Sequence, residues 1–206
     1  MTTPWSLEAP LVRLRDWCEA DLARWNYWLQ PGHRWKELDG PYYALPTPVE
    51  IASMLAKIHD QIQEGSWPIP RQRAVICQPN DAAFLGLVSW YWESQETQWP
   101  GIGIVIFDET WWGRGLGYHA LGLWSEYLFL SLPDILRLDL RTWSGNAGMM
   151  RLAHKLGYRE EARFRQARRV HGTLYDGLGY GILRSEWEEQ FPHGFMVASN
   201  ANVGTE

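Results

Sequence analysis

The chain has 206 residues, 46% of them hydrophobic, and a formal net charge of -5 at pH 7. This length suits a single domain with one core, and the acidic balance lacks the basic excess typical of a nucleic-acid-binding protein. No apolar run reaches membrane length, and the first residues carry no basic-then-apolar leader. The two cysteines lack metal-ligand spacing, so we expect a reduced, cytoplasmic protein without a metal or a membrane partner.

The first third of the chain predicts one strand, two helices and a loop between them. Residues 11–15 alternate and predict a strand, and 18–30 predict a helix that ends at a Pro-Gly pair. Residues 31–48 are rich in turn formers and aromatic residues, and such a loop is either a surface connection or a wall of a binding site. Residues 49–65 predict a second helix with an apolar stripe.

Three strands follow, at residues 73–77, 84–92 and 101–107, joined by short connections that favour antiparallel hairpins. A glycine-rich stretch then opens a helix over 116–130, which Pro133 ends.

The last third predicts a strand at 135–143, a helix within 146–158 that Asn146 caps, and a final hairpin of strands 161–170 and 174–183. This order of elements predicts an α/β or α+β domain with a mixed sheet.

Three glycines, Gly113, Gly115 and Gly117, stand where the strand gives way to the helix. Glycine is unfavourable there unless something must approach the backbone closely. A helix N-terminus presents unpaired N–H groups and the positive end of the helix dipole, and Arg114 adds a guanidinium. The stretch therefore predicts a phosphate cradle.

Two common phosphate motifs fit this stretch incompletely. The P-loop needs Lys followed by Ser or Thr after its last glycine, but Tyr and His stand there. Gly115, Gly117 and Ala120 match the dinucleotide fingerprint G-x-G-x-x-A, with Asp139 near the expected distance. That turn should follow its strand directly, yet six residues intervene after Phe107, so a dinucleotide-binding oxidoreductase is the weaker alternative.

A third pattern covers more of the chain. Residues 112–117 resemble motif A of the GNAT superfamily of acyl-CoA-dependent N-acyltransferases, with Trp112 in place of the usual Gln or Arg. The opening strand and helix at 11–22, the Asn-led helix at 146–165 and the closing strand at 171–187 resemble the RimJ/RimL-like branch.

This resemblance implies a single GNAT-like domain over residues 1–195 and a flexible tail over 196–206. Its sheet would be mixed but mostly antiparallel, splayed between the fourth and fifth strands and flanked by about four helices. The implied enzyme is an N-acetyltransferase that moves the acetyl group of acetyl-CoA to a primary amine, either a small molecule or a protein N-terminus. A non-catalytic acyl-CoA-binding protein is the alternative, and a homodimer remains open.

In such a protein the pyrophosphate of coenzyme A meets the glycine loop, and its pantetheine arm pairs like a strand with residues 104–107. The thioester carbonyl is polarised by a backbone N–H at a bulge near Val105. The implied cofactor-binding residues are Ile104, Val105, Ile106, Phe107, Trp112, Gly113, Arg114, Gly115, Leu116, Gly117, Tyr118 and Asn146.

The catalytic groups of the family match less well. Ala153 stands where some branches have Tyr, Met149 where some have Ser, and a Glu used elsewhere would fall near Gly101. Glu93, at a strand end, is expected to be solvated.

Asp139 is the remaining candidate for the base that deprotonates the amine. By strand alternation it shares a face with Arg137 and Arg141, and pairing with them would hold its pKa low.

The 14 tryptophans and their aromatic neighbours offer walls for a cationic amine through cation–π contacts, although most are expected to fill the core. The candidates for the acceptor site are Trp35, Tyr42, Trp90, Trp92, Trp143 and Tyr175.

Overall fold

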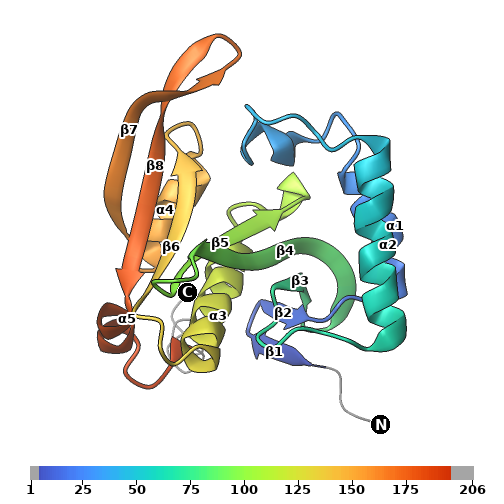
Figure 1. Cartoon of the computed structure of the whole chain (residues 1–206), viewed down its shortest axis with the longest axis horizontal. Coiled ribbons are helices and arrows are strands. Elements are labelled where there is room, and N and C mark those ends of the chain that lie inside the picture. Colours follow the sequence, from blue (N-terminus) through green and yellow to red (C-terminus); the bar gives the residue numbers. More distant parts are fainter. Residues whose placement is uncertain (1–4, 196–206) are drawn as a thin grey trace.

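The structure, a computed structural model, describes residues 5–195 (Figure 1). Its elements in chain order are β1 (Ser6–Ala9), β2 (Val12–Arg15), α1 (Glu19–Trp28), the 3₁₀ turn η1 (Arg34–Glu37), α2 (Pro48–Glu64), β3 (Arg73–Gln78), β4 (Asp81–Ser94), β5 (Trp99–Ile106), the 3₁₀ turn η2 (Glu109–Trp111), α3 (Leu116–Ser131), β6 (Arg137–Trp143), α4 (Ala147–Lys155), β7 (Arg159–Val170), β8 (Thr173–Leu183) and α5 (Arg184–Gln190).

The strands form one sheet in the order β1-β2-β3-β4-β5-β6-β8-β7. Every neighbouring pair is antiparallel except β5 and β6, which are parallel and pair only at Gly101 with Asp139 and at Ile102 with Leu140. Beyond Ile102 the two strands diverge, and Figure 1 shows the opening between them. The predicted mixed, mostly antiparallel sheet is confirmed, with its splay between the fourth and fifth predicted strands.

One strand and one α-helix were not predicted from the sequence, and neither were the two 3₁₀ turns. The strand β1 precedes the expected first strand, and α5 follows the expected last one, so the described residues form eight strands and five α-helices. The side chain of Trp187, on α5, is only 2% exposed, so this helix belongs to the core. The predicted tail at 196–206 lies outside the described residues.

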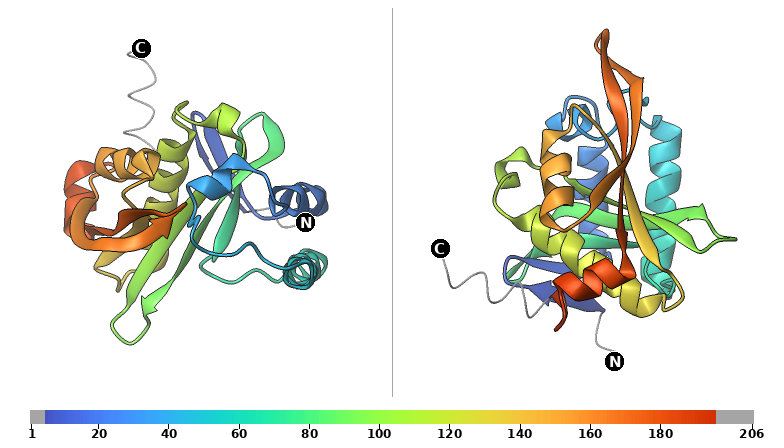
Figure 2. Two further views of the ribbon diagram at one scale, coloured as in Figure 1. Left: turned by 90° about the horizontal axis from the view of Figure 1, so that it is seen from above. Right: turned by 90° about the vertical axis from the view of Figure 1, so that its left-hand side faces the viewer.

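Helices cover both faces of the sheet (Figure 2). On one face α3 packs its buried Trp124 against the strands, and the Trp124 indole N–H donates to the Ser89 carbonyl at 3.0 Å. On the other face α1 and α2 enclose a cluster that contains Trp25, Trp28 and Phe107. Much of the tryptophan content therefore fills the core, as a large apolar ring with one N–H is suited to do.

A buried ion pair ties β2 to α1. Both oxygens of Asp21, whose side chain is 3% exposed, accept from the Arg15 guanidinium at 2.7 and 2.8 Å. Asp21 also accepts from the Cys18 backbone N–H at 2.8 Å, which fixes the start of α1.

Changing Asp21 to Ala is expected to lower the free energy of unfolding by about 3 kcal/mol, because it leaves the Arg15 charge buried without its partner. Urea denaturation measures this change. The same change at the exposed Asp60 of α2 is the control, with an expected effect within about 0.5 kcal/mol. Equal effects at the two positions would contradict a structural role for the pair.

Candidate active site

The N-terminus of α3 is open to a ligand. Gly113 and Gly115 adopt left-handed backbone angles, with φ of 73° and 86°, which favour glycine. Gly115 is the N-cap of α3 and brings no capping side chain, and the first turn holds no acidic residue. The first-turn N–H groups and the helix dipole are therefore available to an anion.

The second feature is the open edge of β5. Among the described residues no strand pairs with the β6-facing edge of residues 103–106. Trp112 covers the end of this edge, because its indole N–H donates to the Ile106 carbonyl at 2.9 Å. The expected bulge near Val105 is wrong: the pairing with β4 is regular from Ile106 to Pro100, and the register shifts only between Trp92 and Ser94.

A cavity of about 930 Å³ follows this opening. It extends from Gly113 and Gly117 at the start of α3, past the open edge of β5, to Phe164 and Arg168 on β7. One cavity thus joins an anion-binding helix end to a strand edge with free backbone groups.

The loop at residues 35–43 forms one wall of the cavity. It is held by the Leu38 carbonyl, which accepts from the Trp143 indole at 2.8 Å and from the Asn146 amide at 3.2 Å. Asn146 also caps α4 as predicted, because its Oδ1 accepts from the Met149 backbone N–H at 2.9 Å. Leu38 was not identified from the sequence, because its backbone carbonyl, and not its side chain, holds the loop in place.

Most predicted cofactor residues lie in the cavity wall, namely Ile104, Val105, Ile106, Trp112, Gly113, Gly117 and Asn146. The others lie beside it. Phe107 is buried between Trp28 and Phe84. Arg114 and Leu116 line a separate hollow of about 380 Å³. Gly115 and Tyr118 belong to the start of α3 without lining the cavity.

The predicted acceptor aromatics divide into two groups. Trp35, Tyr42 and Trp143 line the cavity, and Tyr175 packs edge-on against Trp143 with ring centroids 4.8 Å apart.

Trp90 and Trp92 do not line the cavity but pack against each other in the core, with ring centroids 5.1 Å apart. The Trp90 indole N–H donates to the Arg71 carbonyl at 2.8 Å.

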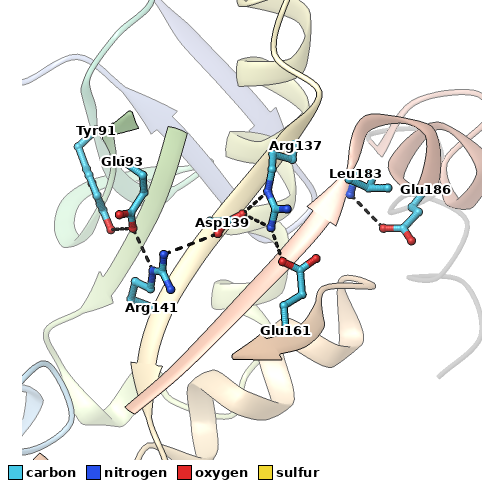
Figure 3. Close-up of polar contacts among 8 residues, drawn as sticks. All are labelled: Tyr91, Glu93, Arg137, Asp139, Arg141, Glu161, Leu183 and Glu186. Atoms are coloured by element: carbon cyan, nitrogen blue, oxygen red, sulfur yellow. Dashed lines mark hydrogen bonds and ion pairs between the residues drawn. The ribbon is translucent and has the colours of Figure 1, made fainter. Parts of the chain in front are cut away.

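A chain of polar contacts crosses the sheet where β5 and β6 part (Figure 3). The Tyr91 hydroxyl donates to Glu93 at 3.1 Å, and Arg141 Nε donates to the same Glu93 oxygen at 3.0 Å. Arg141 also lies 4.0 Å from Asp139, which accepts from Arg137 Nε at 2.7 Å. Tyr91, Glu93 and Arg141 line the cavity, whereas Asp139 is 4% exposed and lies behind them.

The absence of a side chain at Gly101 allows the Tyr91 ring to lie in the cavity wall. A Cβ atom at Gly101 would lie 2.6 Å from Tyr91 Cζ, so the glycine makes room for the tyrosine ring. Gly101 stands near the position where other branches of the family have a catalytic Glu. The Tyr91 ring covers this position, and Glu93 accepts a hydrogen bond from the Tyr91 hydroxyl. Glu93, expected to be solvated, is half-buried in the cavity wall.

Burial shifts the pKa values of two groups in this network of polar contacts, Tyr91 and Asp139. It raises the pKa of Tyr91 to about 12, and the nearby Glu93 charge acts in the same direction. Burial also raises the pKa of Asp139, against the lowering effect of Arg137. The expectation that the arginines would hold this pKa low is therefore wrong, because desolvation outweighs the ion pairs.

Among residues 5–195, no helix combines the length and apolar character that a bilayer span requires. Within the same range, His, Cys, Asp and Glu side chains form no group of three or more that could hold a metal ion.

Comparisons with known proteins agree with this geometry. The chain is 25% identical over 113 residues to the SPbeta prophage-derived uncharacterized N-acetyltransferase YokL of Bacillus subtilis (strain 168), a match that spans 55% of this chain and 63% of that relative. An acetyltransferase (GNAT family) from Bacillus anthracis superposes with a TM-score of 0.68 at 15% identity, over 88% of this chain and 99% of that one.

The Mycobacterium smegmatis RimJ in complex with CoA-disulfide superposes with a TM-score of 0.63 at 18% identity, over 98% of this chain and 94% of that one. At these identities the solved structures show the shared fold. A family model described as "Acetyltransferase (GNAT) domain" matches residues 12–159, so the chain belongs to the GNAT acetyltransferase family.

Proposed function

We propose that this protein is an N-acetyltransferase of the RimJ/RimL-like branch, which moves the acetyl group of acetyl-CoA to a primary amine. The observation that carries the proposal is the single cavity that joins the uncapped start of α3 to the open edge of β5. The dinucleotide-binding alternative loses its support, because the glycine loop lies within the matched GNAT domain.

The two ends of the cavity suit different parts of coenzyme A, and this sets the direction in which we expect it to bind. Its pyrophosphate suits the first-turn N–H groups of α3 near Gly117. Its pantetheine arm suits the unpaired edge of residues 103–106, since an extended amide chain pairs there like a strand. The thioester then lies near Ile102, where β5 and β6 part, close to Tyr91 and Glu93.

Direct transfer needs a neutral amine. We propose that Glu93, through a water molecule, takes a proton from the acceptor ammonium, and Asp139 behind it remains the second candidate. The amine nitrogen then bonds to the thioester carbon, and the carbon–sulfur bond breaks. The Tyr91 hydroxyl gives its proton to the leaving thiolate and regains one from the former amine nitrogen, which loses it as the neutral amide forms.

Changing Tyr91 to Phe is expected to lower kcat about 10-fold, a small effect because a thiolate is a weak base. The pKa of Tyr91 is about 12, so its hydroxyl keeps its proton throughout an assay range of about pH 7 to 10. The loss should therefore be constant over that range. Steady-state kinetics of a variant with unchanged thermal stability checks this, and an unchanged kcat would remove Tyr91 from the mechanism.

Thiol release with acetyl-CoA and a panel of primary amines tests the proposed activity. Amine-dependent release with an equal amount of acetylated amine supports it. Acetyl-CoA binding without turnover of any amine would favour the non-catalytic alternative. That alternative is motivated by Ala153 and Met149, which stand where some branches of the family have Tyr and Ser.

A further inference from the structure

We propose that the acceptor is a primary amine that also carries a carboxylate group, and that Arg168 binds this carboxylate at the β7–β8 end of the cavity. The proposal rests on the proposed acetyltransferase function and names the substrate class of that site.

Arg168 is held in place by its surroundings on β7. It pairs across the hairpin with Tyr175 and lines the cavity. Its guanidinium carbon lies 4.8 Å from the centre of the Tyr42 ring. Its Nε is buried and makes no hydrogen bond to any described residue, although an Arg N–H group is a strong donor. Arginine binds a carboxylate through two parallel N–H···O bonds, and the terminal nitrogens of Arg168 form only one hydrogen bond among the described residues, from Nη1 to the Ala167 carbonyl at 3.3 Å.

Three carboxylates on the β7–β8 hairpin are engaged by other arginines. Arg163 bonds Glu160 at 2.8 Å and Asp176 at 2.9 Å. Glu161 pairs with Arg137. Among residues 5–195 no carboxylate forms an ion pair with Arg168, so this cation in the cavity wall has no direct ionic partner.

The aromatic rings of this end also disfavour a second positive charge on the acceptor. Arg168 covers the Tyr42 ring, and Lys36 Nζ lies 5.8 Å from the centre of the Trp35 ring. Both rings were candidates for a cation–π contact with a cationic amine. Because the chain's own cations occupy them, these two rings are not free for a second cation of the acceptor.

Arg168 lies on the β7–β8 side of the cavity, beyond the point where β5 and β6 part. A Cβ atom at Gly177 would lie 3.7 Å from Arg168 Nε, and Gly177 pairs with Trp143 on β6. Trp143 lies three residues beyond Leu140, where the sheet closes, which is roughly 10 Å along the strand. An acceptor whose amine lies near the closure can therefore extend a carboxylate along β6 toward Arg168.

A panel of matched acceptors tests the charge preference. It consists of α- and ω-amino acids of increasing length, the primary amide of each, and the diamine of the same length. We expect the wild-type kcat/KM to be at least about 10-fold higher for the best amino acid than for its amide, and lowest for the diamine, as a charged hydrogen-bonded contact predicts.

Arg168→Gln should raise KM for that amino acid about 10-fold with little change in kcat, and should leave the amide and the Kd of acetyl-CoA unchanged. Arg168→Lys should restore part of the loss. The control is Arg169→Gln, which removes the same charge from an exposed neighbour outside the cavity wall and should have no effect.

Equal use of amino acids and amides, or equal effects of Arg168→Gln on both, would overturn this inference and leave the acetyltransferase function standing. A rise in the Kd of acetyl-CoA would overturn it by placing Arg168 in the cofactor site. Absence of turnover with every amine would overturn the proposed function and this inference together.

Discussion

Replacing Gly117 with valine is expected to weaken acetyl-CoA binding about 100-fold, while the protein stays folded. Loss of two N–H contacts to a phosphate accounts for this size, because each charged hydrogen bond contributes about 1.5 kcal/mol or more. Gly117 lies in the first turn of α3 and has no left-handed φ, so valine fits the backbone. Its Cβ would lie 3.3 Å from Leu152 Cδ2, a tight contact that the flexible leucine can relieve.

Calorimetric titration with acetyl-CoA measures the effect, and circular dichroism checks the fold. The control is Ala147→Val, a β-branched residue in the exposed first turn of α4 that does not line the cavity. It should bind acetyl-CoA as the wild type does. Unchanged affinity in a folded Gly117→Val protein would contradict the placement of the pyrophosphate. Gly115 is a poorer test, because its φ of 86° would strain any other residue.

Changing Glu93 to Gln is expected to lower kcat about 100-fold near neutral pH, the loss typical of a general base. The loss should shrink as the pH rises, because more of the amine then arrives neutral. Glu96→Gln, at an exposed turn position, is the control and should leave kcat unchanged.

The parallel Asp139→Asn variant separates the two candidate bases. It should keep kcat within a few-fold of the wild type and lower the free energy of unfolding by about 2 kcal/mol, because it weakens a buried bond to Arg137. If instead Asp139→Asn loses kcat at full stability and Glu93→Gln does not, Asp139 is the base and Glu93 is not.

The sequence predicted the order of the main elements, because hydrophobic periodicity, glycines and caps mark them locally. The splay of the sheet followed only from the resemblance to the GNAT superfamily. The sequence missed α5 because the helix starts directly at the end of β8, without a Gly, Pro or capping Ser or Asp. Its N-cap is Leu183, whose backbone N–H donates to the Glu186 side chain at 3.0 Å (Figure 3). It missed β1 because four residues carry little periodic signal.

The site was predictable only where it depends on local backbone. The glycine loop and the Asn146 cap were visible, since both belong to helix starts. The place of Tyr91 over Gly101 depends on the register between two strands.

The direction of Arg168 depends on an irregularity that alternation cannot reveal. The register of β7 shifts between Phe164 and Arg168, and Gln166 within this interval has a φ of 56°.

The central claim is that this cavity transfers an acetyl group from acetyl-CoA to an amine. The most direct measurement follows thiol release and acetylated product together, with acetyl-CoA fixed and the amine varied. The account predicts that thiol release saturates with the amine concentration and equals the acetylated product mole for mole. At limiting acetyl-CoA, the rate of release by Gly117→Val should fall by the same factor as its affinity for acetyl-CoA. Release that does not depend on the amine, or no release from a protein saturated with acetyl-CoA, would contradict it.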